Sequence, residues 1–284
     1  MVLAVNLMPV FMKRRTFINT LMLSSGTIFL GHNFAKGSNI TENAIKVTMI
    51  YNNVGKGENL ISEWGLSILI EKNDEYLLFD TGGKPEVLLE NMRNLGIDLG
   101  KISSIVISHN HWDHVNGLDA FLEKDNLNPS IYVPEFSLSD IYNKYKGVDL
   151  IGVSESRQIN DFVWSTGQLE GRYNNNPLYE QSIFIKDGNS VYLFTGCSHP
   201  GIVKIVEQTR KLIADEDIKL VAGGFHLGKH TEKQIYDISD KLKNLSVEKI
   251  APSHCTGDVA MRIFQDEWGN DFINFDLSLN EVSL

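Results

Sequence analysis

The chain has 284 residues, of which 42% are hydrophobic and 22% are charged, an ordinary composition for a globular protein. Its formal net charge of −10 argues against a nucleic-acid-binding surface, which normally carries a basic patch. The only two cysteines, Cys197 and Cys255, exclude a disulfide framework, although they leave a single bridge open.

The N-terminal segment resembles an export signal rather than part of the fold. Residues 13–18, KRRTFI, contain paired arginines and precede an apolar stretch at 21–30. This arrangement resembles a twin-arginine signal, and the stretch is too short and too interrupted for a membrane span. We therefore expect residues 1–40 to be a signal and linker of a protein exported to the periplasm, without stable membrane insertion. An uncleaved membrane anchor or a cytoplasmic location is the alternative, and Met1 and Met12 are both candidate start residues.

Residues 45–284 predict a single domain of alternating strands and helices, with no linker inside it. Short apolar runs predict strands, and Asn73-Asp74 is a hairpin turn between two of them. Amphipathic runs predict helices, and the helix at 85–95 has Pro85 in its first turn. The expected strands are 45–51, 66–71, 76–79, 102–107, 131–133, 182–185, 191–194, 219–221 and 249–251, and the expected helices are 85–95, 117–123, 202–213 and 232–245.

Residues 134–181 are less regular than the rest of this domain. A stretch of this kind between core strands is either a solvated insertion or a lid over a site, and its aromatic content favours a lid. It contains Gly147, Gly152, Gly167, Gly171, the run Asn174-Asn175-Asn176-Pro177, and the aromatic residues Phe162, Trp164, Tyr173 and Tyr179.

The densest group of metal-binding side chains is SHNHWDH at 108–114, directly after an apolar run. It holds His109, His111, Asp113 and His114. In an extended chain His114 would point away from the other three, so the four converge only if the segment curls into a loop. Imidazole and carboxylate together suit zinc and other divalent metals. One tetrahedral ion could not use all four ligands and stay open for chemistry, whereas two ions could share them.

Three further histidines, His199, His226 and His254, each follow an apolar strand. Strand ends that each deliver a histidine beside small residues indicate one rim of a sheet that faces one site. We expect metal roles for His199 and His254, whereas a metal role and a structural role both stay open for His226. The remaining histidines, His32 and His230, are expected to be inert.

The motif H-x-H-x-D-H, with LLFDTGG before it and GCSHPG and PSHCTG after it, resembles the metallo-β-lactamase superfamily across residues 45–284. The segments WGLSILIE, GCSHPGI and GGFHL are similar to the branch that includes the dihydropterin ribofuranosylaminobenzene 5′-phosphate synthases. The resemblance implies an α/β fold, a four-layer αββα sandwich, with one or two metals at the edge of its β layers.

The resemblance also implies two groups of three metal ligands. The first triad is His109, His111 and His199, and the second triad is Asp113, His114 and His254. Asp80 matches an aspartate that orients ligands and the loop. Many hydrolases of the superfamily carry a bridging aspartate where this chain has residues 223–226, GGFH. His226 is therefore either a replacement ligand or a substrate contact, and the bridging ligand stays open.

These assignments predict a hydrolase, or a related transferase, in which a metal-bound hydroxide attacks a small, anionic ester, phosphoester or lactone. Zinc is the expected metal, with Mn²⁺, Fe²⁺ or Mg²⁺ as alternatives. Asp113 and His226 are the expected catalytic residues: Asp113 orients the nucleophile, and His226 or the second metal stabilises developing negative charge. Cys197 and Cys255 flank ligand histidines and are expected to be small packing residues rather than thiolate ligands.

Two further functions stay open beside hydrolysis. One is a transferase like the synthases named above, although their pterin-pathway reaction is expected in the cytoplasm and conflicts with an export signal. The other is a non-hydrolytic metal-binding or redox member of the fold, but the redox relatives usually carry glutamate where His111 stands. The expected partner is a small-molecule substrate and not a nucleic acid, and the oligomeric state stays open.

Overall fold

The structure, a computed structural model, describes residues 44–122, 127–277 and 281–284. The predicted export signal at 1–40 lies outside these residues. None of the helices found among the described residues has the length and apolar character needed to cross a membrane.

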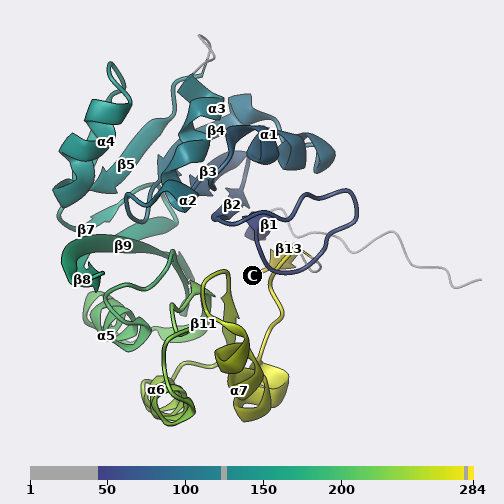
Figure 1. The fold of residues 1–284 in the computed structure, drawn as a ribbon, viewed down its shortest axis with the longest axis vertical. Helices are drawn as coiled ribbons and strands as arrows, with labels where there is room; N and C mark the ends of the chain where they lie inside the picture. Colours follow the sequence, from purple (N-terminus) through teal and green to yellow (C-terminus); the bar gives the residue numbers. More distant parts are fainter. Residues whose placement is uncertain (1–43, 123–126, 278–280) are drawn as a thin grey trace, which may run out of the picture. The chain divides into compact units, whose positions relative to one another are not determined.

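Within the described residues, two β-sheets face each other at the centre of one compact unit (Figure 1). Sheet A has the strand order β13-β1-β2-β3-β4-β5-β6, and sheet B has the order β12-β11-β10-β9-β8-β7. The strands of sheet A are β1 (Lys46–Asn52), β2 (Leu66–Lys72), β3 (Glu75–Phe79), β4 (Ile102–Val106), β5 (Ser130–Pro134), β6 (Leu150–Val153) and β13 (Glu281–Ser283). Those of sheet B are β7 (Glu155–Gln158), β8 (Val163–Tyr173), β9 (Asn176–Asp187), β10 (Ser190–Thr195), β11 (Asp217–Gly224) and β12 (Ile250–Ser253).

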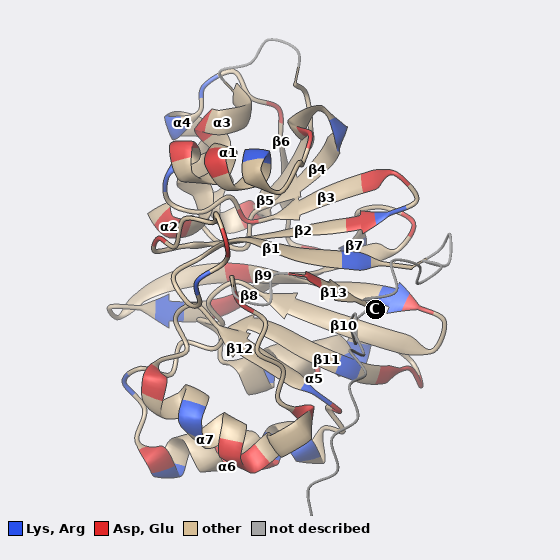
Figure 2. Ribbon diagram, turned by 90° about the vertical axis from the view of Figure 1, so that its right-hand side faces the viewer, with Lys and Arg blue, Asp and Glu red and all other residues tan. Residues whose placement is uncertain are grey.

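Helices cover the outer face of each sheet, and they carry many charged residues (Figure 2). Sheet A packs against α1 (Pro85–Asn94), α3 (Asp119–Leu122) and α4 (Leu138–Lys144). Sheet B packs against α5 (Ile202–Leu212), α6 (Glu232–Asn244) and α7 (Asp258–Trp268). The order of layers is therefore helix, sheet, sheet, helix, which confirms the predicted α/β sandwich and its single domain.

Side-chain alternation along the strands builds this sandwich. In β2, Ile68 and Ile70 point into the apolar cluster between the sheets, whereas Leu69 joins the cluster under α1. Successive side chains of a strand point to opposite faces, so a strand buried on both faces reads as a continuous apolar run. This is why LSILIE was recognisable as a strand.

Two segments differ from the sequence prediction. The expected helix at 117–123 is interrupted, because α2 (Trp112–Val115) is followed by the 3₁₀ turn Asn116–Leu118 before α3 begins. A Cβ atom at residue 117 would lie 1.9 Å from the Thr81 carbonyl oxygen. Glycine at this position therefore lets the chain pass close to the turn after β3. The expected irregular stretch at 134–181 instead forms α4, β6, β7, β8 and the start of β9. Its role as a lid stays a prediction.

The carboxyl ends of several strands meet where the two sheets adjoin. β3 and β4 run parallel in sheet A, and β10, β11 and β12 run parallel in sheet B. Gln181 of β9 connects the two sheets at this point, since its backbone N–H donates to the Ser108 carbonyl at 2.9 Å and its Nε2 donates to the Ile107 carbonyl at 2.8 Å. The segments that follow these strand ends carry all the predicted metal-binding residues.

Candidate metal centre

The segment after β4 curls as the spacing of its histidines predicts. His111 precedes α2, and the backbone N–H of His114 donates to the His111 carbonyl at 3.1 Å. This single helical turn brings Asp113 and His114 back toward His109, whose ring centroid lies 4.2 Å from that of His114.

The members of the first triad lie together. His109 Nε2 is 3.1 Å from His111 Nδ1, and their ligand atoms and that of His199 lie within 4.8 Å of one another. Two nitrogens on one tetrahedral zinc ion are about 3.3 Å apart, so this spacing fits a metal. Both ring nitrogens of His199 are buried without a hydrogen-bond partner. Burial also lowers the pKa of each imidazole, that of His199 to about 2, which keeps the rings in the neutral, metal-binding form.

The members of the second triad also lie together. Asp113 Oδ2 is 3.7 Å from His114 Nε2 and 3.5 Å from His254 Nε2. Trp64 Nε1 donates to the same carboxylate oxygen at 2.8 Å and fixes its position. Burial raises the pKa of the Asp113 carboxyl, but the adjacent His254 and His114 outweigh burial and lower it, so the group is an anion. Six predicted ligands are thus in place, and metal binding by them stays a prediction.

Asp80 orients the second triad, as its position before the TGG turn predicts. Its buried carboxylate accepts hydrogen bonds from Ser108 N, Ser108 Oγ and His114 Nδ1, each at 2.7 Å. Burial lowers the pKa of His114, but the Asp80 carboxylate outweighs burial and raises it to about 9. Because Nδ1 holds a proton for Asp80, His114 Nε2 is the nitrogen that faces the other ligands.

Two polar residues that sequence reasoning missed hold other ligands in place. Asn53 Oδ1 accepts from His254 Nδ1 at 2.6 Å, which directs His254 Nε2 toward Asp113. The buried Glu180 of β9 accepts from the backbone N–H groups of Cys197, Ser198 and His199 at 2.8–2.9 Å. Burial raises the pKa of Glu180 to about 7, although these N–H donors oppose the effect. An acidic residue just before the apolar run SIFI of β9 was the one available signal for Glu180.

His226 lies beside the first triad at the end of β11. Its ring centroid is 4.5 Å from that of His199, and its buried Nδ1 has no hydrogen-bond partner. The backbone φ of His226 is 53°, which is a left-handed conformation that turns the chain sharply out of the sheet. The position is compatible with both of its predicted roles, metal ligand and substrate contact.

Exposed aromatic rings stand at the mouth of the site. Tyr173, at the end of β8, lies with its ring centroid 4.5 Å from that of His111. The Trp64 ring lies 5.3 Å from His254. These two rings are 42% and 46% exposed, and Trp112 beside them is 51% exposed. An aromatic surface therefore borders both triads.

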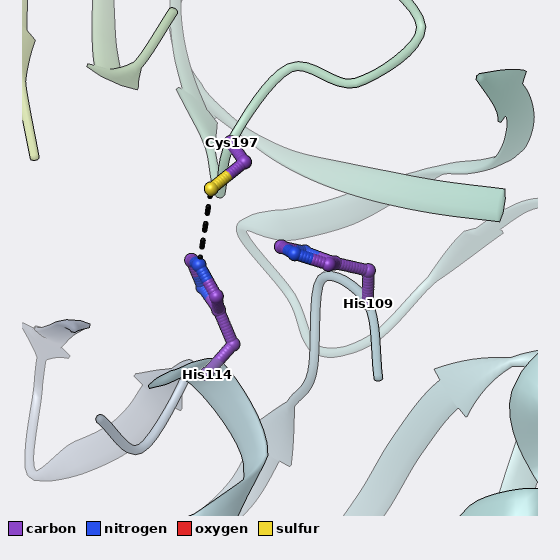
Figure 3. A group of neighbouring side chains, drawn as sticks. All are labelled: His109, His114 and Cys197. Atoms are coloured by element: carbon purple, nitrogen blue, oxygen red, sulfur yellow. Dashed lines mark hydrogen bonds between the residues drawn. The ribbon is translucent and has the colours of Figure 1, made fainter. Parts of the chain in front are cut away.

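Both cysteines are free, and each belongs to a group of possible ligand atoms that includes a histidine. Figure 3 shows Cys197 beside His109 and His114. Cys197 Sγ is 3.2 Å from His114 Nε2 and 3.3 Å from Cys255 Sγ. Burial raises the pKa of the Cys197 thiol. With nitrogen, oxygen and sulfur donors converging on one region, the residues present fit one or two divalent metal ions.

Comparisons with known proteins agree with this geometry. A family model described as the metallo-beta-lactamase superfamily matches residues 65–254. The chain is 30% identical to the 7,8-dihydropterin-6-methyl-4-(beta-D-ribofuranosyl)-aminobenzene-5'-phosphate synthase of Methanocaldococcus jannaschii, over 74% of this chain and 87% of that protein. Among solved structures, Tm1679, described as a metal-dependent hydrolase of the beta-lactamase superfamily, has a TM-score of 0.68 at 26% identity, over 84% of this chain and 98% of that chain. The metallo-beta-lactamase fold protein YhfI from Bacillus subtilis has a TM-score of 0.62 at 14% identity, over 85% of this chain and 100% of that chain.

Proposed function

The chain belongs to the metallo-beta-lactamase superfamily, and from this membership we propose that it is a metal-dependent hydrolase, or a related transferase, acting on a small anionic substrate. The family binds divalent metals, and this chain has ligand groups for them. Zinc is the metal we propose, because most of the ligands are imidazoles.

One observation carries the proposal. The His199 ring contacts the rings of His109 and His111, and both of its nitrogens are buried, yet neither has a hydrogen-bond partner. An unsatisfied buried polar atom costs about 1–3 kcal/mol, and a bound cation would remove that cost. By contrast, the opposite nitrogens of His114 and His254 are held by Asp80 and Asn53, as expected for histidines that bind a metal through the other nitrogen.

The side chains around the two triads have separate roles in the proposed reaction. A bound divalent ion supplies Lewis acidity and lowers the pKa of water from about 15.7 to about 7. Asp113, held by Trp64 Nε1 at 2.8 Å, presents a fixed carboxylate that orients the attacking group. His226 faces the cleft beside His199 and donates a hydrogen bond to the oxygen that gains negative charge. Trp64, Trp112 and Tyr173 supply apolar surface that excludes water from the substrate.

Two features support a ring-containing, negatively charged substrate. The exposed aromatic rings at the mouth stack well on planar groups. Divalent metals bound by the two triads would favour anionic oxygens.

Similarity to the Methanocaldococcus jannaschii synthase over 87% of its length makes a synthase-like transfer reaction the second candidate. A small molecule, rather than a nucleic acid, is the partner that we propose.

The test combines metal analysis with turnover. The full chain is loaded with zinc and assayed on generic phosphodiester, lactone and β-lactam substrates. We expect His111→Ala to lose metal and activity together, because His111 is a member of the first triad. The control is His230→Ala, which removes an exposed histidine outside both triads and should behave as wild type. Activity that survives complete metal removal would overturn the proposal.

A labelling experiment separates hydrolase from transferase. Turnover is run in oxygen-18 water, and the product is analysed by mass spectrometry. Hydrolysis places one labelled oxygen in the product, whereas transfer to an organic acceptor does not. Label in the product supports the hydrolase, and unlabelled product formed only when an acceptor is added supports the synthase-like reaction.

A further inference from the structure

A cavity of about 470 Å³ adjoins the second triad and the start of α7. His254 and Trp64 line it on the side of the triad, where Trp64 Nε1 donates to Asp113 at 2.8 Å. Gly257 and Asp258 line it on the side of α7. Ligand pockets have volumes of about 300–1,000 Å³. The cavity is therefore large enough for one part of a small molecule whose reacting part lies at the triads.

The first turn of α7 offers backbone N–H groups to this cavity. Gly257 is the N-cap residue of α7, and no side chain caps the helix there. Met261 N–H donates to the Gly257 carbonyl at 3.1 Å, which begins the helical series of hydrogen bonds. The N–H groups ahead of Met261 in the helix have no carbonyl one turn earlier to accept them. The positive end of the helix dipole therefore lies at the wall of the cavity.

Close packing of two chain segments requires glycine at residue 257. A Cβ atom there would lie 2.9 Å from Gly228 Cα, and the backbone φ of Gly257 is 90°, which favours glycine. Gly228 belongs to the segment after β11 and also lines the cavity. The glycine that allows this approach has no side chain to cap the helix, so the N–H groups of the first turn stay available to a ligand.

A second, independent feature of the cavity is the hydroxyl group of Ser253. Ser253 is the last residue of β12, lines the cavity and is 1% exposed. Its Oγ is buried and has no hydrogen-bond partner among the described residues. The Ser253 carbonyl accepts from Thr256 N at 3.1 Å and from Thr256 Oγ1 at 2.6 Å, which fixes the turn into α7. Buried hydroxyls are normally hydrogen-bonded, so Ser253 Oγ marks a place where a ligand gains a hydrogen bond.

The donors at this cavity are neutral groups, and its positive potential comes from the helix. No lysine or arginine is among the residues that line it, and Asp258 is the one carboxylate among them. The Asp258 side chain is exposed, so water and salt screen its charge. Helix N-termini bind phosphate and carboxylate groups through backbone N–H donors and the helix dipole. A divalent ion in the second triad would add positive charge at the wall that His254 forms.

We propose that this cavity binds an oxyanion of the substrate, a phosphate or a carboxylate remote from the reacting bond, through Ser253 Oγ and the first turn of α7; this rests on the proposed metal-dependent function. Ser253 and α7 position the substrate and select for it, and they make no bond to a metal. The substrate class is thereby narrowed to molecules that carry an anionic group at one end and the reacting bond at the other.

The first test is isothermal titration calorimetry of the zinc-loaded full chain with inorganic phosphate and with acetate. The anion that binds more tightly distinguishes a phosphate from a carboxylate substrate. Ser253→Ala should weaken binding of that anion about 10-fold at unchanged zinc content. Asp258→Asn should strengthen it about 2–3-fold at low salt, because a negative charge is removed. Ser103→Ala, at an exposed serine near the start of β4, is the matched control and should bind as the wild type does. Equal affinity of the wild type and Ser253→Ala for both anions would overturn the proposal.

Crystals of the zinc-loaded wild type decide the question even if Ser253→Ala does not fold or loses zinc. They are soaked with tungstate, a phosphate mimic, and with 4-bromobenzoate, a carboxylate, and each anion is located by its anomalous scattering. We expect one of the two beside Ser253 Oγ and the first turn of α7. Anions found only on the zinc ions, or nowhere, would overturn the proposal and leave the proposed function standing. A chain that binds no zinc at all would instead contradict the proposed function, on which this inference rests.

Discussion

At the scale of single residues, Asp80 determines which nitrogen of His114 is available to bind a metal, although Asp80 is not itself a member of either triad. Its carboxylate accepts from His114 Nδ1 and from both donors of Ser108. The strained backbone of Asp80, with φ of 59°, is the cost of aiming this carboxylate back under the loop. The position thus combines an unfavourable conformation with three favourable hydrogen bonds.

Asp80→Asn is expected to weaken metal binding with little change of side-chain volume. An amide group facing His114 Nδ1 donates a proton there, which moves the ring proton of His114 to Nε2 and blocks that ligand atom. We expect about a 10–100-fold loss of metal affinity, measured by metal analysis after dialysis against competing chelator. The exposed Asp240→Asn is the control. Unchanged affinity in Asp80→Asn would show that Asp80 does not select the tautomer.

His226→Gln is expected to keep full metal occupancy but to raise KM or reduce kcat. His226 lies in neither triad, and its unpartnered Nδ1 faces the cleft beside His199. A glutamine of similar reach keeps a hydrogen-bonding group but changes its position. The measurements are metal content and steady-state kinetics, with His230→Gln as the control. Reduced occupancy would identify His226 as a ligand, and wild-type values throughout would make it structural.

At the scale of elements, the turn between β10 and α5 depends on β9. Glu180 of β9 is the acceptor for three successive backbone N–H groups of that turn, those of Cys197, Ser198 and His199. Ser198 has a φ of 60°, so the turn holds an unfavourable conformation that Glu180 stabilises. His199 takes its position from this turn.

Glu180→Ala is therefore expected to lower the free energy of unfolding by about 3–5 kcal/mol, because buried N–H groups lose their acceptor. Urea denaturation of the metal-free protein measures this change. Glu170→Ala, at an exposed position of the neighbouring strand β8, should change the free energy by less than about 0.5 kcal/mol. A loss below about 1 kcal/mol in Glu180→Ala would show that water or a rearranged turn replaces the carboxylate.

Sequence patterns predicted elements where the local signal was strong. The continuous apolar run of β2 and the proline-started helix α1 were both recognisable from a few residues. The long strand β8 was missed, and β9 was predicted only over residues 182–185, because the turn that joins the two strands is rich in asparagine and resembles an insertion. The helix α7 was missed as well.

The residues of the candidate site, like the strands and helices, were predicted only where the local sequence signal was strong. The HxHxDH segment and the strand-end histidines carry a local signal, so candidate ligands were identified from their spacing, whereas their division into two triads came from the family resemblance. Asn53 could not be identified, because its partner His254 is 201 residues away and no pattern links the two positions. Glu180 was missed because acceptors for backbone N–H groups have no fixed sequence spacing.

At the scale of the whole molecule, the candidate metal centre draws its residues from both halves of the sandwich. The segment 108–114 follows a strand of sheet A, whereas His199 and His254 follow strands of sheet B. Each triad contains residues from both sheets. A metal that binds the folded state alone therefore stabilises the contact between the sheets.

Removal of metal by a chelator is expected to lower the Tm by about 5–10 °C for each site, relative to protein with free zinc at 100 times its Kd. Binding at that concentration contributes about 2.7 kcal/mol per site, and each kcal/mol shifts the Tm by about 2–4 °C in a domain of this size. Scanning calorimetry of the apo and reloaded protein measures the shift. His111→Ala should show a smaller shift, and an equal Tm for both forms of the wild type would contradict a metal that spans the sheets.

The distribution of ligands over both sheets also bears on the order in which this protein matures. A growing chain that has made only β1 to β6 of sheet A would present residues 108–114 without their partners from sheet B, and nitrogen ligands alone favour whichever transition metal binds nitrogen most strongly, copper above all. His199 and His254 join only after β10 and β12 have docked. Geometric discrimination between metals therefore begins after folding, so the compartment in which the chain completes its fold, and the metals free in that compartment, decide which ion the finished protein retains.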